Sequence, residues 1–289
     1  MSITLEVATP DSLDEIVEAV AVWKRDGVPV QLHPGDLGWN WSLGTQELAE
    51  AVQVWRRDGQ ILAVGMVDDD AGLIRMAIAP SVDEDDAFAA RLLADLSDPG
   101  RGVLPVGGGA VEARFGAAFR DLLGRTGWAA DEPWTPLCRD LTAPVEDCGL
   151  RLDVVDAHNV QDRVAVHRAA FPNSTFSLER WQAMSGASPY RRARCLVGYD
   201  RDGDAVAAVT VWSAGQGRPG LLEPLGVHRD HRGHGYGTAI SVAAAAALQE
   251  MGSSTATVCT PSANVGGVAT YVAAGFQKLS DVTDFRRTS

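Results

Sequence analysis

Lysine is nearly absent from this chain of 289 residues: of its 25 basic residues, only Lys24 and Lys278 are lysines. Four scattered cysteines form no C-x-x-C pair, which argues against both a disulfide framework and a thiolate zinc site. The sequence also lacks an apolar run long enough to span a membrane and a basic-then-apolar leader. We therefore expect a protein of the reducing cytoplasm with no membrane partner.

Positive charge is scarce in the first half of the chain, and the net charge of −13 is unevenly divided. Residues 1–149 hold 26 acidic and 11 basic residues, whereas residues 150–289 hold 12 acidic and 14 basic residues. Binding of nucleic acid needs clustered Lys and Arg, so a nucleic-acid partner is disfavoured. Only the second half offers a favourable field for a highly anionic ligand.

The most informative stretch is Arg232-Gly233-His234-Gly235-Tyr236-Gly237, between a strand-like run at 221–227 and a helix-like run at 238–249. A glycine-rich turn between strand and helix directs backbone N–H groups and the positive end of a helix dipole at one anion. Glycines allow positive φ and close approach of phosphate oxygens, because they carry no Cβ. The turn is neither a dinucleotide fingerprint nor a P-loop, and it predicts a pyrophosphate site.

The chain after this turn makes the pattern more specific. A β-rich run at 255–260 is followed by Asn264 and then by a helix-like run that holds Tyr271 and ends at Gly275-Phe276. In the order and spacing of these elements, residues 150–289 resemble the GNAT superfamily of acyl-CoA-dependent N-acyltransferases. The resemblance implies that acetyl-CoA is the co-substrate and that an acetyl group passes to a primary amine of a small molecule.

The resemblance also implies roles for individual residues. The backbone of Leu225-Gly226-Val227 would pair with the pantetheine amides, and the Val227 N–H would hold the oxyanion of the tetrahedral intermediate. Tyr271 would act as general acid and protonate the leaving thiolate of coenzyme A. Asn264 would lie near the pantetheine. The pyrophosphate would bind the loop residues Arg232, Gly233, His234, Gly235, Tyr236, Gly237 and Thr238.

Glu223 is the only acid in the strand-like run before the loop, on the same face as Leu225 and Val227 by the two-residue period of a strand. A carboxylate there could take the proton that an ammonium substrate must lose before its nitrogen attacks. A common family pattern instead has the acid two residues earlier, where this chain has Leu221. Glu223 is therefore a candidate general base, with a substrate-binding or a paired structural carboxylate as the alternatives.

Two further groups of residues have simpler interpretations. His228, His231 and His234 are three residues apart, but no other ligand type accompanies them, so we interpret them as loop histidines and predict no metal site. The glycine-rich loop that holds Trp39 and Trp41 is interpreted as packing between the two halves, with a binding lid as the alternative.

The two halves of the sequence align at a nearly constant offset of 147 to 148 residues, which indicates a duplicated domain. By this alignment the first copy lacks the loop, the candidate base and the candidate acid. Glu84, Ala87 and Ala89 occupy the positions of the loop, Arg75 occupies that of the candidate base, and Leu123 occupies that of the candidate acid. We therefore predict a degenerate GNAT domain at 1–143 without an acyl-CoA site, and a catalytic GNAT domain at 150–289.

The second half alternates between strand-like and helix-like runs. Strands are predicted at 150–155, 193–200, 204–213, 219–228, 255–260 and 276–287, and helices at 160–170, 177–185, 235–251 and 264–274. This pattern predicts an α+β (mixed α/β) fold, which the repeat makes two tandem GNAT folds with largely antiparallel mixed sheets flanked by helices. The resemblance implies that strands 4 and 5 splay apart. Pro224, which cannot donate to a sheet ladder, suits that point.

Together these features predict a cytoplasmic N-acetyltransferase that acts by direct attack in a ternary complex, either as a monomer with two pseudo-symmetric halves or as a homodimer. The acceptor amine would be lined by the loop 171–176 with Trp181 and Trp212. The alternatives are a non-catalytic module that binds acyl-CoA and a protein partner, and an antibiotic-modifying acetyltransferase.

Overall fold

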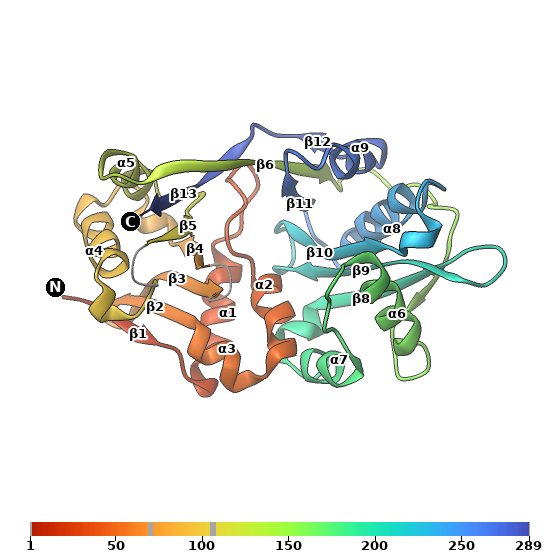
Figure 1. The fold of residues 1–289 in the computed structure, drawn as a ribbon, viewed down its shortest axis with the longest axis horizontal. Coiled ribbons are helices and arrows are strands. Elements are labelled where there is room, and N and C mark those ends of the chain that lie inside the picture. The colour runs from red at the N-terminus through yellow and green to blue at the C-terminus, as the bar shows by residue number, and fades with distance from the viewer. Residues whose placement is uncertain (1, 69–71, 105–107, 289) are drawn as a thin grey trace. The chain divides into compact units, whose positions relative to one another are not determined.

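The chain divides into two compact units whose borders do not follow the midpoint of the sequence (Figure 1). The structure is a computed structural model and describes residues 2–68, 72–104 and 108–288. Unit 1 comprises Met1–His33, Thr45–Trp134 and Asp281–Ser289, and unit 2 comprises Pro34–Gly44 and Thr135–Ser280. Unit 1 therefore contains residues 281–289 of the predicted domain 150–289, and unit 2 contains residues 34–44 and 135–143 of the predicted domain 1–143. We call residues 34–44 and 281–289 the exchanged segments.

Unit 1 is built on strands in the order β1-β2-β3-β4-β5-β13-β6. They are β1 (Ile3–Val7), β2 (Val52–Arg57), β3 (Gln60–Asp68), β4 (Leu73–Ile78), β5 (Gly108–Glu112), β13 (Val282–Thr288) and the first part of β6 (Ala129–Asp140). β4 and β5 run parallel, and the other neighbours run antiparallel. The helices are α1 (Leu13–Val22), α3 (Thr45–Ala51), α4 (Asp86–Ser97) and α5 (Ala117–Arg125).

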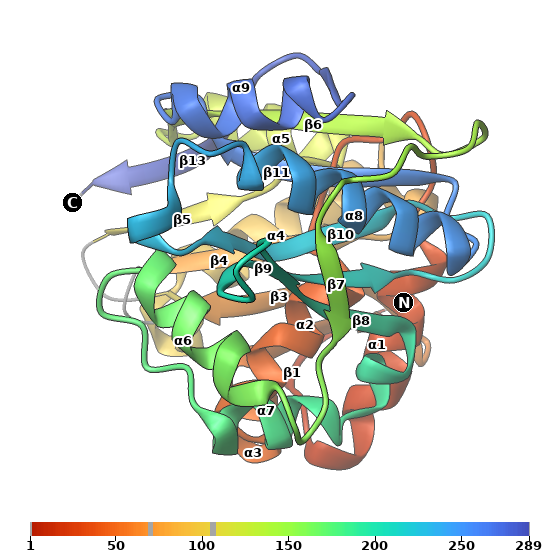
Figure 2. The ribbon, with the colours of Figure 1, turned by 90° about the vertical axis from the view of Figure 1, so that its right-hand side faces the viewer.

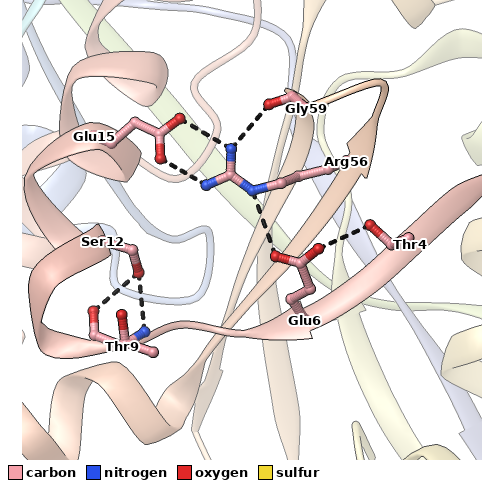
Figure 3. Close-up of polar contacts among 7 residues, drawn as sticks. All are labelled: Thr4, Glu6, Thr9, Ser12, Glu15, Arg56 and Gly59. Carbon is pink, nitrogen blue, oxygen red and sulfur yellow. Dashed lines mark hydrogen bonds and ion pairs between the residues drawn. The ribbon is translucent and has the colours of Figure 1, made fainter.

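One guanidinium joins the first helix of unit 1 to its first two strands (Figure 3). Arg56 of β2 makes a bidentate pair with Glu15 of α1 at 2.9 and 2.7 Å, and its Nε lies 3.6 Å from Glu6 of β1. This hydrogen bond from Arg56 holds the pKa of the Glu15 carboxyl below its usual value. Because the Glu15 side chain is mostly exposed, the pair orients α1 more than it stabilises the fold.

Unit 2 is built on strands in the order β6-β11-β10-β9-β8-β7, with β12 on β6. Besides the second part of β6 they are β7 (Arg151–Val154), β8 (Ala193–Tyr199), β9 (Ala205–Ser213), β10 (Gly220–Val227), β11 (Thr255–Pro261) and β12 (Gln277–Lys278). β10 and β11 run parallel, whereas β7 to β10 are antiparallel to one another in turn. The helices are α2 (Pro34–Asn40), α6 (Val160–Ala170), α7 (Leu178–Ser185), α8 (Tyr236–Glu250) and α9 (Val265–Ala273).

The elements predicted for the second half agree with the structure to within a few residues, except at the C-terminal end. The strand predicted at 276–287 is divided into β12 and β13, with a break at residues 279–281. β12 pairs with β6 within unit 2, whereas β13 pairs with β5 within unit 1. The partner strands lie far away in the sequence, so no local pattern in 276–287 marks the break.

Pairing between β10 and β11 ends after two residues. Gly220 and Leu221 pair with β11, and no later residue of β10 has a partner there among the residues that the structure describes. The register of β10 against β9 shifts between Leu222 and Leu225, around Pro224, which has no N–H to donate. β10 and β11 therefore splay apart towards the C-terminal end of β10, as the resemblance implies for strands 4 and 5.

Alternate residues of the unit 2 strands face two separate hydrophobic clusters, because side chains of a strand point to opposite faces in turn. Leu222 and Val211 pack with α8, whereas their neighbours Leu221 and Trp212 pack in the cluster that contains α6. Figure 2 shows α8 and α9 on one side of these strands and α6 and α7 on the other. The alanines at 243–247 let α8 lie close to its face of the sheet.

The exchanged helix α2 packs on Trp212, on the α6 side of unit 2. A Cβ at Gly35 would lie 2.4 Å from Trp212 Cγ, and a Cβ at Gly38 would lie 2.4 Å from Trp212 Cζ3. Both distances are far below van der Waals contact, so α2 can approach the indole only with glycine at these two positions. The loop with the two tryptophans, which the sequence assigns to packing between the halves, thus begins as a helix in the core of unit 2.

Gly38→Ala is expected to destabilise the protein by about 1–3 kcal/mol, because the added methyl group overlaps the ring of buried Trp212. Gly266→Ala is the matched control in the same unit, since its added methyl group meets no heavy atom within 4 Å. The control should change the free energy of unfolding by less than about 1 kcal/mol. Both values come from denaturant unfolding, and equal stability of the two variants would contradict the packing of α2.

Candidate active site

The N-terminal end of α8 has no side-chain cap. Its N-cap residue is Gly235, at φ +82°, and within the described part of the chain no side chain accepts a hydrogen bond from the first turn. The N–H groups of Tyr236, Gly237 and Thr238 have no partner within an α-helix by its geometry. Together with the turn at Gly233, which has φ +84°, they form a concave set of donors suited to an anion.

In unit 1 the corresponding helix is α4, and a carboxylate of the chain itself caps its N-terminal end. Asp85 caps α4 by accepting a hydrogen bond from the Phe88 N–H at 2.9 Å, and it also pairs with Arg57 at 2.9 Å. The bond from Phe88 is the main reason that the pKa of Asp85 is lowered. Arg75, at the position aligned with Glu223, pairs with Glu112 of β5 at 3.1 Å. An anion at this helix end would have to displace a carboxylate.

The open edge of β10 faces the gap between β10 and β11. The His228 N–H donates to the Val206 carbonyl of β9, so by strand alternation Gly226 also directs its backbone groups at β9. Leu225 and Val227 therefore direct their backbone N–H groups away from β9, towards the gap. An extended chain of amides that entered the gap would find donors and acceptors there, as an added strand does.

Tyr271 and Glu223 lie within electrostatic range of each other. Tyr271 of α9 is 9% exposed, and its ring makes an edge contact with Phe276 at a centroid distance of 5.8 Å. Burial, and secondarily the charge of Glu223, raises the pKa of Tyr271 above its usual value. The phenol therefore keeps its proton at neutral pH and can donate it. The Trp212 indole N–H donates to the Glu223 carbonyl at 2.7 Å, which fixes the backbone at this residue.

Residues 159–276, which include the uncapped helix and the open strand edge, match the family model described as the acetyltransferase (GNAT) family. This part of the chain is a GNAT acetyltransferase domain. It follows that the chain is an enzyme of the acyltransferase class. No curated protein matches the chain at a significant level.

Several solved structures share the fold over nearly the whole length of this chain. A GNAT-family acetyltransferase from Colwellia psychrerythraea is 15% identical, with a TM-score of 0.62 and coverage of 100% of both chains. A GCN5-related N-acetyltransferase from Sphaerobacter thermophilus is 17% identical, with a TM-score of 0.57 and coverage of 99% of this chain and 95% of that one. A tandem GNAT protein from the clavulanic acid biosynthesis pathway is 15% identical, with a TM-score of 0.60 and coverage of 99% and 98%. These likenesses establish a tandem GNAT fold.

Several predicted cofactor residues of the GNAT domain also make structural contacts. An Arg232 Nη donates to the Ala170 carbonyl at 3.0 Å and so caps the C-terminal end of α6. Asn264 caps α9 by accepting from the Gly267 N–H at 3.1 Å. Gly237 lets α8 and α9 approach, since a Cβ there would lie 2.9 Å from Thr270. The sequence pattern did not reveal the contacts of Arg232 and Gly237, because Ala170 and Thr270 lie on other elements, whereas the Asn264 cap is local to the start of α9.

The remaining loop residues are open to solvent or nearly so. His234 is exposed and stacks on Tyr236 at a centroid distance of 5.9 Å, while His228 and His231 lie 5.3 Å apart. Among the described residues, no group of three or more His, Cys, Asp or Glu side chains is arranged to hold a metal ion. In the same residues, no helix combines the length and the apolar character that crossing a membrane requires.

An aromatic cluster lies on the side of β10 that faces α6. Trp39 of the exchanged helix stacks on Phe176 at 5.0 Å, and His167 of α6 lies between Trp39, at 5.4 Å, and Phe171, at 4.7 Å. A Cβ at Gly226 would lie 2.9 Å from the Phe171 ring, so this cluster reaches β10 beside the gap. The sequence analysis predicts the loop 171–176, which holds Phe171 and Phe176, as part of the acceptor site, but it gave no reason to expect Trp39 next to these rings.

Two buried polar side chains lie behind these rings, and sequence reasoning missed both. Arg163 is 1% exposed, donates from Nε to the Cys195 thiol at 3.3 Å, and stacks over Phe176 at 5.2 Å. It has no carboxylate partner among the described residues. Burial, followed by the charge of Arg163, lowers the pKa of His167 to about 3. His167 is therefore a neutral imidazole at physiological pH.

The neutral state of His167 makes stability depend on pH. The unfolded chain takes up a proton here below its ordinary pKa of 6.5, whereas the folded protein does not until about pH 3. Stability is therefore lost as the pH falls through this window. His167→Phe keeps an aromatic ring without titrating. Lowering the pH from about 7.5 to about 5 should shift the free energy of unfolding in favour of the variant by up to about 2 kcal/mol. A constant offset between the two proteins in denaturant unfolding would contradict a buried neutral His167.

Proposed function

We propose that this protein transfers an acetyl group from acetyl-CoA to a primary amine of a small molecule, by direct attack in a ternary complex. The observation that carries the proposal is the uncapped N-terminal end of α8 at the mouth of the gap between β10 and β11. A ligand that carries a pyrophosphate and a chain of amides suits both features. The pyrophosphate accepts hydrogen bonds from the N–H groups at the helix end, and the amides pair with the free edge of the strand.

The cofactor would bind along these two features. The residues from Arg232 to Thr238 would hold the pyrophosphate, with the N–H groups of the first turn as donors. Leu225 and Val227 would pair with the pantetheine amides from the open edge of β10. Asn264 would border the pantetheine from the start of α9.

The transfer itself needs one base, one oxyanion donor and one acid. Glu223 would take a proton from the ammonium form of the acceptor, which frees the nitrogen lone pair. The nitrogen would then form a bond to the thioester carbon, and the Val227 N–H would stabilise the oxyanion. As the carbon–sulfur bond breaks, Tyr271 would give its proton to the thiolate. Solvent would then return one proton to Tyr271 and remove those left on Glu223 and the amide nitrogen.

We place one such site in the chain, in unit 2, and none in unit 1. Asp85 fills the end of α4, and the Arg75–Glu112 pair bridges β4 and β5 where unit 2 has its gap. The described cysteines are free, which fits a reducing cytoplasm. A duplicated fold suits a monomer with two pseudo-symmetric halves, and a homodimer is the alternative.

Tyr271→Phe should lower kcat for acetyl transfer by about 100-fold or more, because the variant keeps the ring but loses the proton donor. Free thiol released from acetyl-CoA is measured across a panel of primary amines that includes amino acids and aminoglycosides. Stabilisation by acetyl-CoA in a thermal shift assay should be unchanged in the variant. Binding of acetyl-CoA without thiol release from any amine would favour the non-catalytic module, and turnover of aminoglycosides alone would favour the antibiotic-modifying enzyme.

Gly235→Glu should abolish the rise in melting temperature that acetyl-CoA produces. The substitution puts a carboxylate at the helix end and a Cβ at φ +82°, so it opposes the anion in two ways. Ala87→Glu is the matched control, since the alignment pairs Ala87 with Gly235 and the residue is exposed in the first turn of α4. Loss of stabilisation in the control would contradict a single site in unit 2.

A further inference from the structure

Arg163 of α6 is a buried guanidinium without a counter-ion in the part of the chain that the structure describes. The side chain is 1% exposed, and only its Nε has a hydrogen-bond partner there, the Cys195 sulfur at 3.3 Å. Its Nη2 is buried and has no partner among the same residues. The adjacent acid, Asp162, accepts instead from the Tyr199 hydroxyl at 2.7 Å. Arginine stays protonated in proteins, and a buried charge is costly unless an opposite charge accompanies it. The fold therefore leaves one positive charge for an anion from outside to neutralise.

The groups in contact with this guanidinium do not complete its hydrogen bonding. The ring of Phe176 lies 5.2 Å from it, which gives a cation–π contact. Cys195 also accepts from the Thr210 hydroxyl at 3.4 Å, so two donors share its sulfur. His167, four residues further along α6, is neutral, and its Nδ1 is a second buried atom without a hydrogen-bond partner in the described residues. An anion with two oxygen atoms can accept from Arg163, and also from His167 in the tautomer that carries its proton on Nδ1.

The strand register places Arg163 near the proposed base, Glu223. Cys195 of β8 pairs with Thr210 of β9, and Thr210 lies opposite the register shift of β10 that contains Glu223. Trp212 packs in the same hydrophobic cluster as Cys195, and its indole donates to the Glu223 carbonyl. Neighbouring strands are about 4.8 Å apart, so the backbones of Cys195 and Glu223 are separated by about 10 Å. One small molecule can span this distance between the guanidinium and the base.

A loop, rather than a helix or a strand, carries the ring that covers the guanidinium. Residues 171–177 connect α6 to α7 without regular secondary structure, and their Phe176 is the ring that lies over Arg163. Phe171 of the same loop lies beside β10, since a Cβ at Gly226 would be 2.9 Å from its ring. The loop therefore extends from the open strand edge to Arg163, and it is the loop that the sequence predicts as part of the acceptor site. Displacement of this loop would expose the guanidinium while α6 keeps it in place.

We propose that the acceptor carries a carboxylate as well as its primary amine, and that Arg163 binds this carboxylate. The inference rests on the proposed function, because the amine of the same molecule must reach Glu223. A carboxylate matches the planar guanidinium and supplies one negative charge for the one uncompensated positive charge. The separation of two strand spacings favours an amine several bonds away from the carboxylate, as in an ω-amino acid, over an α-amine. Arg163 is thus a specificity residue for the acceptor and takes no part in making or breaking bonds.

The test compares ω-amino acids with their uncharged amides, which keep the amine and lose the negative charge. 4-Aminobutyrate and 6-aminohexanoate are paired with 4-aminobutanamide and 6-aminohexanamide. Values of kcat/KM for acetyl transfer are measured, and dissociation constants are measured by calorimetry on the full chain in the presence of coenzyme A. Wild type should prefer at least one acid over its amide by about tenfold or more, as a charge-assisted contact implies.

Arg163→Met removes the charge and keeps an unbranched apolar chain, so it should abolish this preference by raising KM for the acids while KM for the amides stays unchanged. Arg163→Lys keeps the charge but loses the planar fork, and it should retain part of the preference. Arg168→Met is the matched control, since it removes an exposed arginine from the same helix, and it should behave as wild type. Melting temperatures establish that each variant is folded, and R163K carries the comparison if R163M does not fold.

Two results would overturn this inference while leaving the proposed function standing. One is equal binding of acids and amides by wild type, including no binding of either. The other is an equal loss for acid and amide in the Arg163 variants, which would give Arg163 a structural role only. Absence of thiol release with every amine would instead count against the proposed function, and the calorimetric comparison would still decide whether Arg163 recognises a carboxylate.

Discussion

The early end of pairing between β10 and β11 is the constraint on which the rest of this site depends. Pro224 removes a donor from β10, and the register against β9 shifts around it. Leu225 and Val227 then direct their backbone N–H groups into a gap without a strand partner. Unpaired donors are costly when buried, so the gap needs either water or a ligand with amides of its own. Glu223 lies beside Pro224 on β10 and its charge acts on Tyr271, so the two residues proposed for proton transfer lie near each other.

The two units share one architecture but differ in whether a side chain caps the N-terminal end of the corresponding helix. α4 in unit 1 is capped by Asp85, whereas α8 in unit 2 begins at Gly235 without a side-chain cap. A helix N-terminus attracts negative charge. In unit 1 a carboxylate of the chain itself supplies this charge, and in unit 2 the helix end is left open to an anionic ligand. The uneven charge of the two halves follows the same division, because only the second half lacks an acidic excess.

Much of the GNAT domain could be predicted, because its signals are local. The splay at Pro224, the glycine turn and the helix that holds Tyr271 each depend on residues close together in the sequence. The role of α2 could not be predicted in this way. Glycines such as Gly35 and Gly38 are typical of a loop in the sequence. Only the position of the Trp212 ring shows that they form the face of a helix that packs on it. The pair of Arg163 and His167 was hidden for the same reason, since their environment comes from other elements.

The sequence by itself determined the strands and helices, the duplication, the loss of the loop in the first copy, and the order of the residues that resemble a GNAT site. These properties follow from hydrophobic period, backbone freedom at glycine and proline, and spacing along the chain. Only the tertiary structure decided that residues 34–44 and 281–289 belong to the opposite units, that Arg232 caps α6, and that Arg163 is buried against Cys195. Each of these depends on partners far away in sequence, which packing brings together and no local pattern encodes.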